Sequence, residues 1–441
     1  MTSPEPHGMP VDGIRHAAPH SARHQAGHHA RSVADHAAAV EDLLRPLRSP
    51  ERTEHLPLRV ALGRGLVHDI PAPISLPPFP NSQMDGYAIR SADVPDGGGE
   101  LRVMPPVPAG ASPDGLRPGT AAPIMTGAML PDGADAVVPI ERAVPDRFLP
   151  PVVPAAGQAT GQTTQQATVQ LPPAVPGTFV RAAGSDILAG ETALAAGTFL
   201  GPAQLGLLAA LGIPDVTVYK AVTVLLVTTG DEVVEPGQEL PDGKIYDSNG
   251  TLLEAAMRQA GLLVRRAGIA TDHPDALRTL LRAEGGAADL IVTTGGVSKG
   301  AYEVVRQAME DQPVEFLHVA MQPGGPQGIG SFEGIPFLGF PGNPVSCLVS
   351  FEMFLRPVLA GLLGTPAPRL PVRARLAQQL TSPEHKHQVR RGTLQPDGTV
   401  ELQGGESSHL MHALAGSNVL VHVPVGVAAL AAGAEVEVWM L

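Results

Sequence analysis

Cysteine, aromatic residues and positive charge are all scarce in this chain of 441 residues. The single cysteine, Cys347, excludes an intrachain disulfide and argues against a cluster of thiolate metal ligands. Aromatic residues make up 3% of the sequence, which disfavours a platform for stacking nucleic-acid bases. The 30 Lys and Arg residues stand against 43 Asp and Glu residues, a net charge of −13. We therefore expect no nucleic-acid partner, because such binders need a basic face.

Long apolar runs are missing as well. No stretch of about 18 uninterrupted apolar residues occurs, and the nearest approach, 199–213, is broken by Pro202 and Gln204. The first 40 residues lack the apolar segment of a secretory signal. We expect a cytoplasmic protein with no membrane partner.

Glycine and proline, by contrast, are abundant, with 50 and 46 residues, and predict many turns and β-rich parts. At roughly 150 residues per domain, the length predicts about three domains. Two segments have a biased composition: a histidine-rich leader, and a stretch rich in Pro, Gln, Thr and Ala near 145–177, interpreted as a flexible insertion. Four histidines of the leader recur every fourth residue: His16, His20, His24 and His28. On a helix they would share a face and a transition metal, but Pro19 interrupts the stripe and a disordered tail is the favoured interpretation.

Strands and helices alternate between residues 221 and 364. Apolar strand patterns lie at 222–227, 263–270, 289–296, 315–321 and 336–340, and helical patterns at 251–259, 275–284, 302–309 and 345–363. Ser248 and Asn249 are the expected N-caps of the first of these helices. The alternation predicts a doubly wound, mostly parallel α/β domain. Flanking β-rich domains and a C-terminal β-barrel-like domain, with a hairpin around Pro396-Asp397-Gly398, complete the predicted multidomain α/β plus β fold.

Four polar, glycine-rich segments follow predicted strands. They are 228–232, 293–298, 322–326 and 341–346. Because the carboxyl ends of parallel strands meet at one edge of a sheet, we expect these segments to form one phosphate or oxyanion site. The candidate binding residues are Thr294, Gly295, Gly296, Ser298, Pro341, Gly342, Asn343 and Ser346.

Carboxylates near that edge predict a magnesium site. A carboxylate beside a phosphate repels it unless a divalent cation lies between them, and Mg²⁺ takes one or two carboxylates plus phosphate and water. Glu232, Asp272 and Glu303 are the expected ligands, whereas for Asp231 a capping or turn role is as good an interpretation. His273 is expected to be a surface residue.

Several motifs, in order, resemble one known family. NSQMDGYA, IMTGAMLPDGADAVVPIE, TTGDE with YDSNG, TTGGVS, FPGNPVS and SSHLMHALAGSNVLVHVPVG are similar to motifs of the molybdopterin molybdenumtransferases, which include MoeA and the C-terminal domain of gephyrin. The resemblance runs from about residue 33 to 441. It implies an enzyme of molybdenum cofactor biosynthesis, which inserts molybdate into adenylylated molybdopterin and, with Mg²⁺, releases AMP.

The resemblance also implies an assembly and a set of catalytic residues. It implies a homodimer whose site lies between the α/β domain of one subunit and the β-rich domain of the other, and it leaves room for a molybdopterin adenylyltransferase partner. The implied catalytic residues are Asp85, Thr126, Asp186, Glu232 and Asp272. The expected divisions are a leader (1–32), a discontinuous first domain for dimerisation (33–76 and 187–220), a β-rich domain (77–186), an α/β domain (221–365) and a C-terminal β domain (366–441).

The chain departs from the family pattern at charged positions. Ala301 and Glu303 stand where many members have two acids, and Gln322 and Gly325 stand where many have lysines. Pro123 and Ser185 replace a usual arginine and acid, while Arg181 remains nearby. Lys299 is a candidate to restore the missing positive charge.

Two other functions stay open at this point. Molybdopterin adenylyltransferases use similar TTGG loops, but the NSQMDGYA segment and the β-rich tail argue against that assignment. A non-catalytic scaffold is the second, and the acids Asp85, Asp186, Glu232 and Asp272 argue against it. Cys347 is interpreted as a small apolar residue on a buried helix face and not as a thiol donor.

Overall fold

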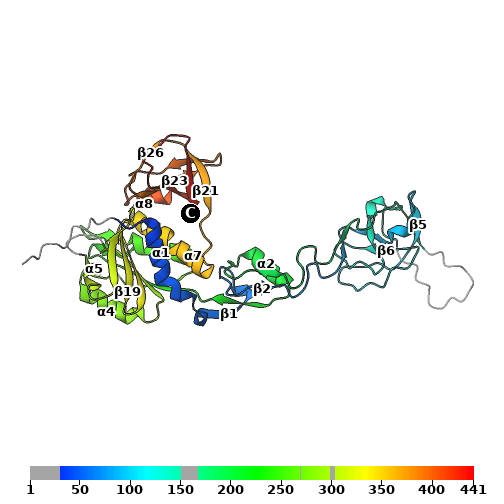
Figure 1. Cartoon of the computed structure of the whole chain (residues 1–441), viewed down its shortest axis with the longest axis horizontal. Helices are drawn as coiled ribbons and strands as arrows, with labels where there is room; N and C mark the ends of the chain where they lie inside the picture. The colour runs from blue at the N-terminus through cyan, green and yellow to red at the C-terminus, as the bar shows by residue number, and fades with distance from the viewer. Residues whose placement is uncertain (1–29, 150–166, 269, 298–302) are drawn as a thin grey trace, which may run out of the picture.

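The computed structural model describes residues 30–149, 167–268, 270–297 and 303–441. Figure 1 shows an elongated molecule. The α/β unit and the C-terminal domain lie together at one end, a small unit with helix α2 (Pro202–Ala210) lies in the middle, and the β-rich domain lies at the far end. The histidine-rich leader falls almost wholly outside the described residues, as do Ser298, Lys299 and Ala301.

A six-stranded sheet, ordered β15-β12-β16-β20-β19-β17, forms the α/β unit. Its strands are β12 (Thr223–Thr228), β15 (Leu263–Arg266), β16 (Leu290–Thr294), β17 (Val314–His318), β19 (Pro326–Phe332) and β20 (Ile335–Phe340). Its helices are α3 (Ser248–Gln259), α4 (Pro274–Gly285), α5 (Val304–Ala308), α6 (Pro344–Ser350) and α7 (Arg356–Leu363), the last two joined by a π-helical turn (Phe351–Leu355). Strands β15, β12, β16 and β20 are parallel, which confirms the predicted doubly wound sheet.

Strand β19 was not predicted, because its glycine-rich sequence is typical of a loop. It runs antiparallel to both β17 and β20, so β17 keeps the direction of the parallel strands. Close backbone approach explains the glycine at 330, since a Cβ there would lie 2.0 Å from the carbonyl oxygen of Pro313. Two neighbouring strands thus stabilise a segment that local propensity disfavours.

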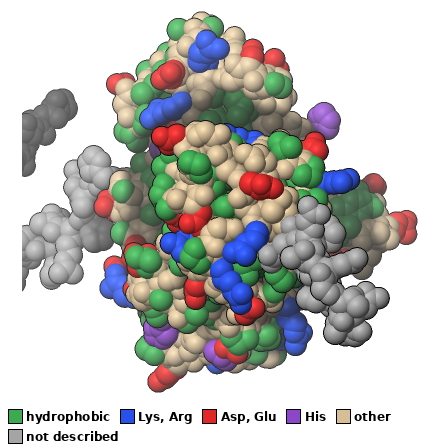
Figure 2. All heavy atoms as spheres, turned by 90° about the vertical axis from the view of Figure 1, so that its right-hand side faces the viewer, with side chains coloured by type: hydrophobic (Ala, Val, Ile, Leu, Met, Phe, Trp, Pro, Cys, Tyr) green, Lys and Arg blue, Asp and Glu red, His purple; other side chains and the backbone are tan. Residues whose placement is uncertain are grey.

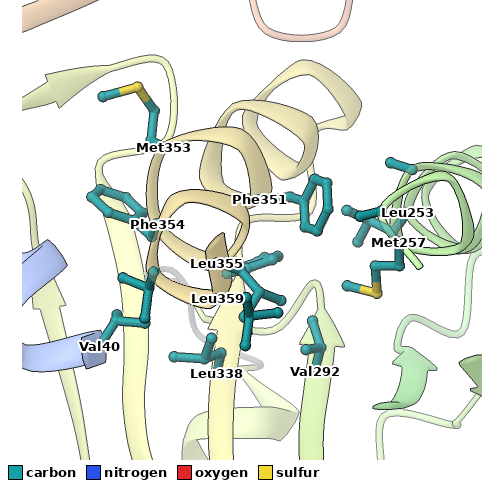
Figure 3. Close-up of a cluster of buried hydrophobic side chains, with 14 of the residues drawn as sticks. Val40, Leu253, Met257, Val292, Leu338, Phe351, Met353, Phe354, Leu355 and Leu359 are labelled. Carbon is teal, nitrogen blue, oxygen red and sulfur yellow. The ribbon is translucent and has the colours of Figure 1, made fainter. Parts of the chain in front are cut away.

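The core of this unit lies around the helical segment Pro344–Leu363. Figure 3 shows Phe351, Phe354 and Leu359 projecting from it toward neighbouring elements. Helix α1 (Val33–Leu44) also packs here, through the fully buried Val40 and Leu44. The helix at the start of the expected first domain therefore shares the core of the α/β unit, while the division of the chain by residue number remains a prediction. By length and composition, 344–363 meets the criteria for a membrane span, but most of it is buried inside this unit.

A buried ionic cluster connects this helix to the C-terminal domain. The Glu352 side chain, fully buried, lies 3.1 Å from Arg356 and 2.8 Å from Arg369, a residue of the connecting segment. Burial is the main cause that lowers the pKa of Arg356, and Arg369 lowers it further. Both guanidinium groups therefore depend on one carboxylate for neutralisation.

We expect Glu352→Ala to destabilise the fold by about 3–5 kcal/mol, because it leaves two buried cations unpaired. Glu254→Ala is the matched control, since the Glu254–Arg258 pair is more exposed and should contribute below about 1 kcal/mol. Urea unfolding followed by far-ultraviolet circular dichroism measures both variants. Equal midpoints for the two variants would contradict the assigned role of Glu352.

The β-rich domain has a five-stranded sheet ordered β7-β4-β6-β5-β8 and a small pair, β3 with β9. The strands are β3 (Asn81–Ser82), β4 (Gly86–Ile89), β5 (Gly99–Val103), β6 (Thr120–Ile124), β7 (Ala136–Pro139), β8 (Thr168–Leu171) and β9 (Val180–Arg181). The prediction of a flexible insertion over all of 145–177 was wrong at β8. Val169 and Leu171 alternate with polar residues and are buried, so this strand pairs with β5 as ordinary sheet.

The middle unit contains two short strand pairs besides α2. They are β1 (Thr53–Pro57) with β11 (Asp215–Tyr219), and β2 (Ile70–Pro71) with β10 (Thr192–Leu194). Short 3₁₀ turns occur in several parts of the described chain, at Arg45–Arg48, Pro50–Arg52, Leu58–Val60, Ser91–Asp93 and Ile140–Arg142. Figure 2 looks along the long axis from the β-rich end, and on the described part of that face acidic and basic side chains are intermixed.

The C-terminal domain is a closed barrel of five strands, as the sequence predicted. The strands are β21 (Pro371–Leu376), β23 (His387–Leu394), β24 (Thr399–Leu402), β25 (Val419–Val423) and β27 (Glu435–Met440). The pairing of β23 with β25 closes the ring, and β23 with β24 is the predicted hairpin. Strand β18 (Met321–Gln322), from the α/β unit, pairs with β23, and β22 (Leu380–Thr381), β26 (Ala429–Leu430) and α8 (Met411–Ala415) complete the domain.

Candidate active site

A cavity of about 1120 Å³ lies at the carboxyl ends of the parallel strands. All four glycine-rich segments expected at this edge contribute to its lining, which confirms that they meet. The antiparallel β19 does not disturb this arrangement, because β17 again points toward the same edge. The candidate residues from the sequence that line the cavity are Glu232, Asp272, Gly295, Gly296, Glu303, Pro341, Gly342, Asn343 and Ser346.

Glu232 projects from the segment after β12, at the mouth of the cavity. Its carboxylate lies over Gly230, where an added Cβ would approach an oxygen to 2.6 Å. Gly230 has φ +136°, a conformation that other residues rarely adopt, so the backbone favours glycine there. The strand–turn geometry thus holds an exposed carboxylate, without an ion pair to any described residue, beside the cavity.

Asp272 is oriented by its neighbour across the sheet edge. The backbone N–H of Asp272 donates to Asp231 Oδ1 at 3.0 Å, and the backbone N–H of Asp231 donates to Asp272 Oδ2 at 3.3 Å. This reciprocal pair links the segment after β12 to the segment after β15. It gives Asp231 the turn role that the sequence allowed, and leaves Asp272 Oδ1 without a hydrogen-bond partner among the described residues.

The three expected magnesium ligands share the cavity but do not form a preformed cage. Glu232, Asp272 and Glu303 all line it. Within the described ranges, no three His, Cys, Asp or Glu side chains converge closely enough to hold a metal by themselves. Mg²⁺ nonetheless fits this donor set, because it takes only one or two carboxylates and completes its shell with phosphate and water.

The TTGG segment is held by close packing. A Cβ on Gly295 would lie 2.9 Å from the carbonyl oxygen of Thr229, and a Cβ on Gly296 would lie 2.9 Å from Val305. Both glycines also have a positive φ, a backbone conformation that other residues rarely adopt. Glycine is therefore suited to both positions of this cavity wall. Thr294, by contrast, is fully buried and is not among the lining residues. Its hydroxyl group donates to the carbonyl oxygen of Pro341 at 3.2 Å and so supports the wall from behind.

Cys347 lies behind the same wall. It is fully buried, its Sγ lies 2.8 Å from Thr294 Oγ1, and burial raises the pKa of its thiol to about 12. A thiol so protected is a structural residue, as the sequence indicated.

The YDSNG segment supplies site residues whose roles sequence reasoning missed. The N-cap of α3 is Asp247 and not Ser248 or Asn249, because Asp247 Oδ1 accepts from the Gly250 N–H at 2.8 Å. Asn249 instead donates to the carbonyl oxygen of Gly342 at 2.6 Å and to Thr294 Oγ1 at 3.2 Å. Its Oδ1 is buried and accepts no hydrogen bond from a described residue.

The barrel provides a second wall that was also missed, although the SSHLMHALAGSNV motif contained part of it. Lys386, Glu406, Ser407, Ser408 and His409 line the cavity from this side. The backbone N–H of Val345 donates to the carbonyl oxygen of Ser408 at 3.0 Å and joins the barrel to the start of α6. Lys386 is the one Lys or Arg among the described lining residues, and it forms no ion pair with a described residue.

Asp85, Thr126 and Asp186 lie elsewhere. Asp85 directly precedes β4 and Thr126 closely follows β6, two strands of the β-rich domain at the far end of the molecule (Figure 1). Asp186 lies in the segment after β9, where its backbone N–H donates to the carbonyl oxygen of Leu76 at 2.9 Å. Asp85 Oδ1 accepts from the backbone N–H of Thr126 at 2.6 Å and from its hydroxyl at 2.8 Å. The first of these hydrogen bonds is the main cause that lowers the pKa of the Asp85 carboxyl group. One chain therefore brings Asp85 to Thr126, but does not bring either to Glu232 or Asp272.

Comparisons with known proteins identify the family. Three family models match consecutive parts of the chain: the MoeA N-terminal region (domains I and II) at 31–212, a probable molybdopterin-binding domain at 225–361, and the MoeA C-terminal region (domain IV) at 373–441. Molybdopterin molybdenumtransferase 2 of Mycobacterium tuberculosis is 43% identical over 424 residues, which cover 93% of this chain and 99% of that protein. This chain belongs to the molybdopterin molybdenumtransferase family.

Other members support the assignment along the whole length. The molybdopterin molybdenumtransferase of a Nostoc species is 34% identical, covering 93% of this chain and 94% of that protein. Two crystal structures of MoeA from Pyrococcus horikoshii are similar, with TM-scores of 0.77 at 25% identity and 0.69 at 32% identity. They cover 94% and 91% of this chain. Members of this family act in molybdenum cofactor biosynthesis, which confirms the expectation of a molybdenum-inserting enzyme of that process.

Proposed function

We propose that this transferase inserts molybdenum from molybdate into adenylylated molybdopterin at the cavity of the α/β unit, with Mg²⁺-dependent release of AMP. The observation that carries the proposal is the two-sided lining of one cavity. Glu232, Asp272 and Glu303 lie on the α/β side, and Lys386 projects from the barrel. A volume of about 1120 Å³ exceeds that of typical small-molecule pockets and suits a substrate made of a pterin and a nucleotide.

The carboxylates suit the end of the substrate that carries the phosphoanhydride. When Mg²⁺ is bound there, it supplies charge neutralisation and polarises the phosphoryl oxygens. Glu232 and Asp272 would hold it, with Glu303 at the same cavity as a further oxygen donor. The Asp231–Asp272 pair keeps one carboxylate pointed at the substrate, so the ligand is oriented before binding.

The other lining residues suit the oxyanion and the pterin. Lys386 is the one Lys or Arg among the described residues that line the cavity, and it would attract molybdate. The buried Oδ1 of Asn249 has no hydrogen-bond donor among the described residues, and a pterin ring carries N–H donors that would satisfy it. Gly295 and Gly296 also line the cavity, so a substrate bound there would lie against their backbone.

We further propose that the active enzyme is a homodimer whose partner supplies Asp85, Thr126 and Asp186 to this cavity. The support is that these residues lie far from their own α/β unit, while Thr126 holds Asp85 in its ionised form. A molybdopterin adenylyltransferase is the partner whose product this site would consume. A cytoplasmic location remains an expectation.

Calorimetric titration of the purified protein with adenylylated molybdopterin, in Mg²⁺ and in EDTA, tests the proposal. We expect binding that Mg²⁺ strengthens, since the cation removes repulsion between the phosphates and the carboxylates. An adenylyltransferase would instead bind free molybdopterin and ATP, and a scaffold would bind neither ligand. Either result would replace the proposed function.

We expect Lys386→Ala to raise the KM for molybdate by about tenfold, because a hydrogen bond to a charged group is lost. Lys386→Arg should retain most of the affinity. The control is Lys220→Ala, which removes the same charge from an exposed position outside the cavity. Initial rates at varied molybdate concentration decide the point, and an unchanged KM in Lys386→Ala would assign molybdate binding to other groups.

A further inference from the structure

A buried glutamine joins two side chains that line the cavity from different domains. Gln388, in β23, is fully buried and does not line the cavity itself. Its Nε2 lies 3.0 Å from Gln322 Oε1 and 3.3 Å from Glu406 Oε2. Gln322 belongs to the segment after β17 and Glu406 to the barrel, and both line the cavity. Gln388 is therefore placed to control how they face the substrate.

The carboxylate determines the orientation of both amides. An ionised Glu406 only accepts hydrogen bonds, so Gln388 must direct its NH₂ group toward it. The same NH₂ group faces Gln322, which must then present its carbonyl oxygen. The NH₂ group of Gln322 consequently lies on the side away from Gln388, where the cavity is.

We propose that Gln388 is a positioning residue, which holds the Gln322 amide so that its NH₂ group donates hydrogen bonds to an oxyanion in the cavity. The inference rests on the proposed function, in which that oxyanion is molybdate. Gln322 then offers neutral, directed donors at a position where many family members carry a lysine. Affinity for the oxyanion depends on the direction of one amide instead of a fixed charge.

Two further observations support this role. The backbone places the pair in register, since Gln322 is paired with Gln388 and the His387 N–H donates to the carbonyl oxygen of Ala320 at 2.9 Å. Gln388 Oε1 is buried and has no hydrogen-bond partner among the described residues. A purely structural position has no reason to keep an amide with an unpaired acceptor, whereas the donor half of this amide connects both cavity residues.

Gln388→Glu is the decisive variant, because it keeps the size of the side chain and removes the NH₂ group. A carboxyl group there lies against Glu406 and shares a proton with it, so its remaining oxygen draws the Gln322 NH₂ group toward itself. Gln322 then presents its carbonyl oxygen to the cavity, opposite an anion. We expect Gln388→Glu to weaken molybdate binding by about tenfold or more. Gln388→Met, which only frees Gln322 to rotate, should weaken it by about threefold.

The measurement is calorimetric titration of the full-length protein with molybdate alone, repeated with tungstate. Gln322→Met should lose affinity as well, and in that background Gln388→Glu should have no further effect. The matched control is Gln395→Glu in the turn at the other end of β23, which adds the same charge outside the cavity lining. The control Gln395→Glu should bind both molybdate and adenylylated molybdopterin with wild-type affinity.

Each outcome separates this inference from the proposed function. Wild-type affinity in Gln388→Glu, with molybdate still bound by the wild-type protein, overturns the positioning role and leaves the transferase intact. The positioning role is also overturned if Gln388→Glu lowers the molybdate affinity equally in the wild-type and in the Gln322→Met background. The effect would then not depend on the Gln322 amide. Should Gln388→Glu fail to fold, unchanged binding in Gln388→Met contradicts the inference. Lack of molybdate binding by the wild-type protein overturns both proposals.

Discussion

Glu232→Gln is expected to lower the rate of molybdenum insertion by about a hundredfold or more, since metal-assisted charge stabilisation contributes several kcal/mol to such a step. The carboxylate of Glu232 lies over Gly230 at the cavity, without an ion pair to any described residue. The amide has the same shape but binds Mg²⁺ poorly, so the loss should be partly recovered at high Mg²⁺ concentration. Single-turnover kinetics over a range of Mg²⁺ concentrations measures both effects.

Glu239→Gln is the matched control, because Glu239 is exposed in the same connecting segment and does not line the cavity. It should react at the wild-type rate. If both variants lose activity equally, the effect reflects general electrostatics and not a ligand position. If Glu232→Gln reacts at the wild-type rate and with the wild-type Mg²⁺ dependence, Glu232 is not a Mg²⁺ ligand of the proposed site.

Mixing two inactive variants should restore activity if the site is shared between subunits. Asp85→Asn and Glu232→Gln each damage both sites of a homodimer, but a mixed dimer has one site with both native carboxylates. With random exchange, half of the dimers are mixed and about a quarter of the wild-type activity returns, as two-fold symmetry requires. Co-expression with two affinity tags isolates the mixed dimer, whose activity should be about half that of the wild type.

The control mixes Glu232→Gln with Asp272→Asn, two residues that line the same cavity of one chain. In that mixed dimer, each site retains one lesion, so no activity should return. Recovery in both mixtures, or in neither, would contradict a site that takes Asp85 from the partner.

Much of the site was predictable because its chemistry follows strand ends. The apolar runs that became β12, β16 and β20 are fixed by burial, and glycines after each of them marked the edge where ligands bind in a doubly wound sheet. The position of Glu232 and Asp272 at the site could be predicted from that rule alone. The conformations of Gly230, Gly295 and Gly296 then explain why glycine, and no other residue, recurs there.

The remaining features depend on contacts between segments distant in sequence. Strand β19 exists because β17 and β20 flank it, and Asp247 displaced Ser248 as the helix cap because its carboxylate also meets Thr228 and Arg266. The pairing of β18 with β23 joins two domains and brings Lys386 to the cavity and Gln388 to the lining residue Gln322. No local pattern indicates such a pairing, since two-residue strands carry almost no periodicity.

The most direct test of the proposed function is AMP release from adenylylated molybdopterin by the purified protein. Reactions with Mg²⁺ and molybdate are compared with reactions that lack each ion, and the molybdenum bound to the pterin product is measured in parallel. We predict that AMP and molybdenum cofactor form in equal amounts and only when both ions are present. Tight binding of adenylylated molybdopterin without AMP release under these conditions would contradict the account and indicate a carrier.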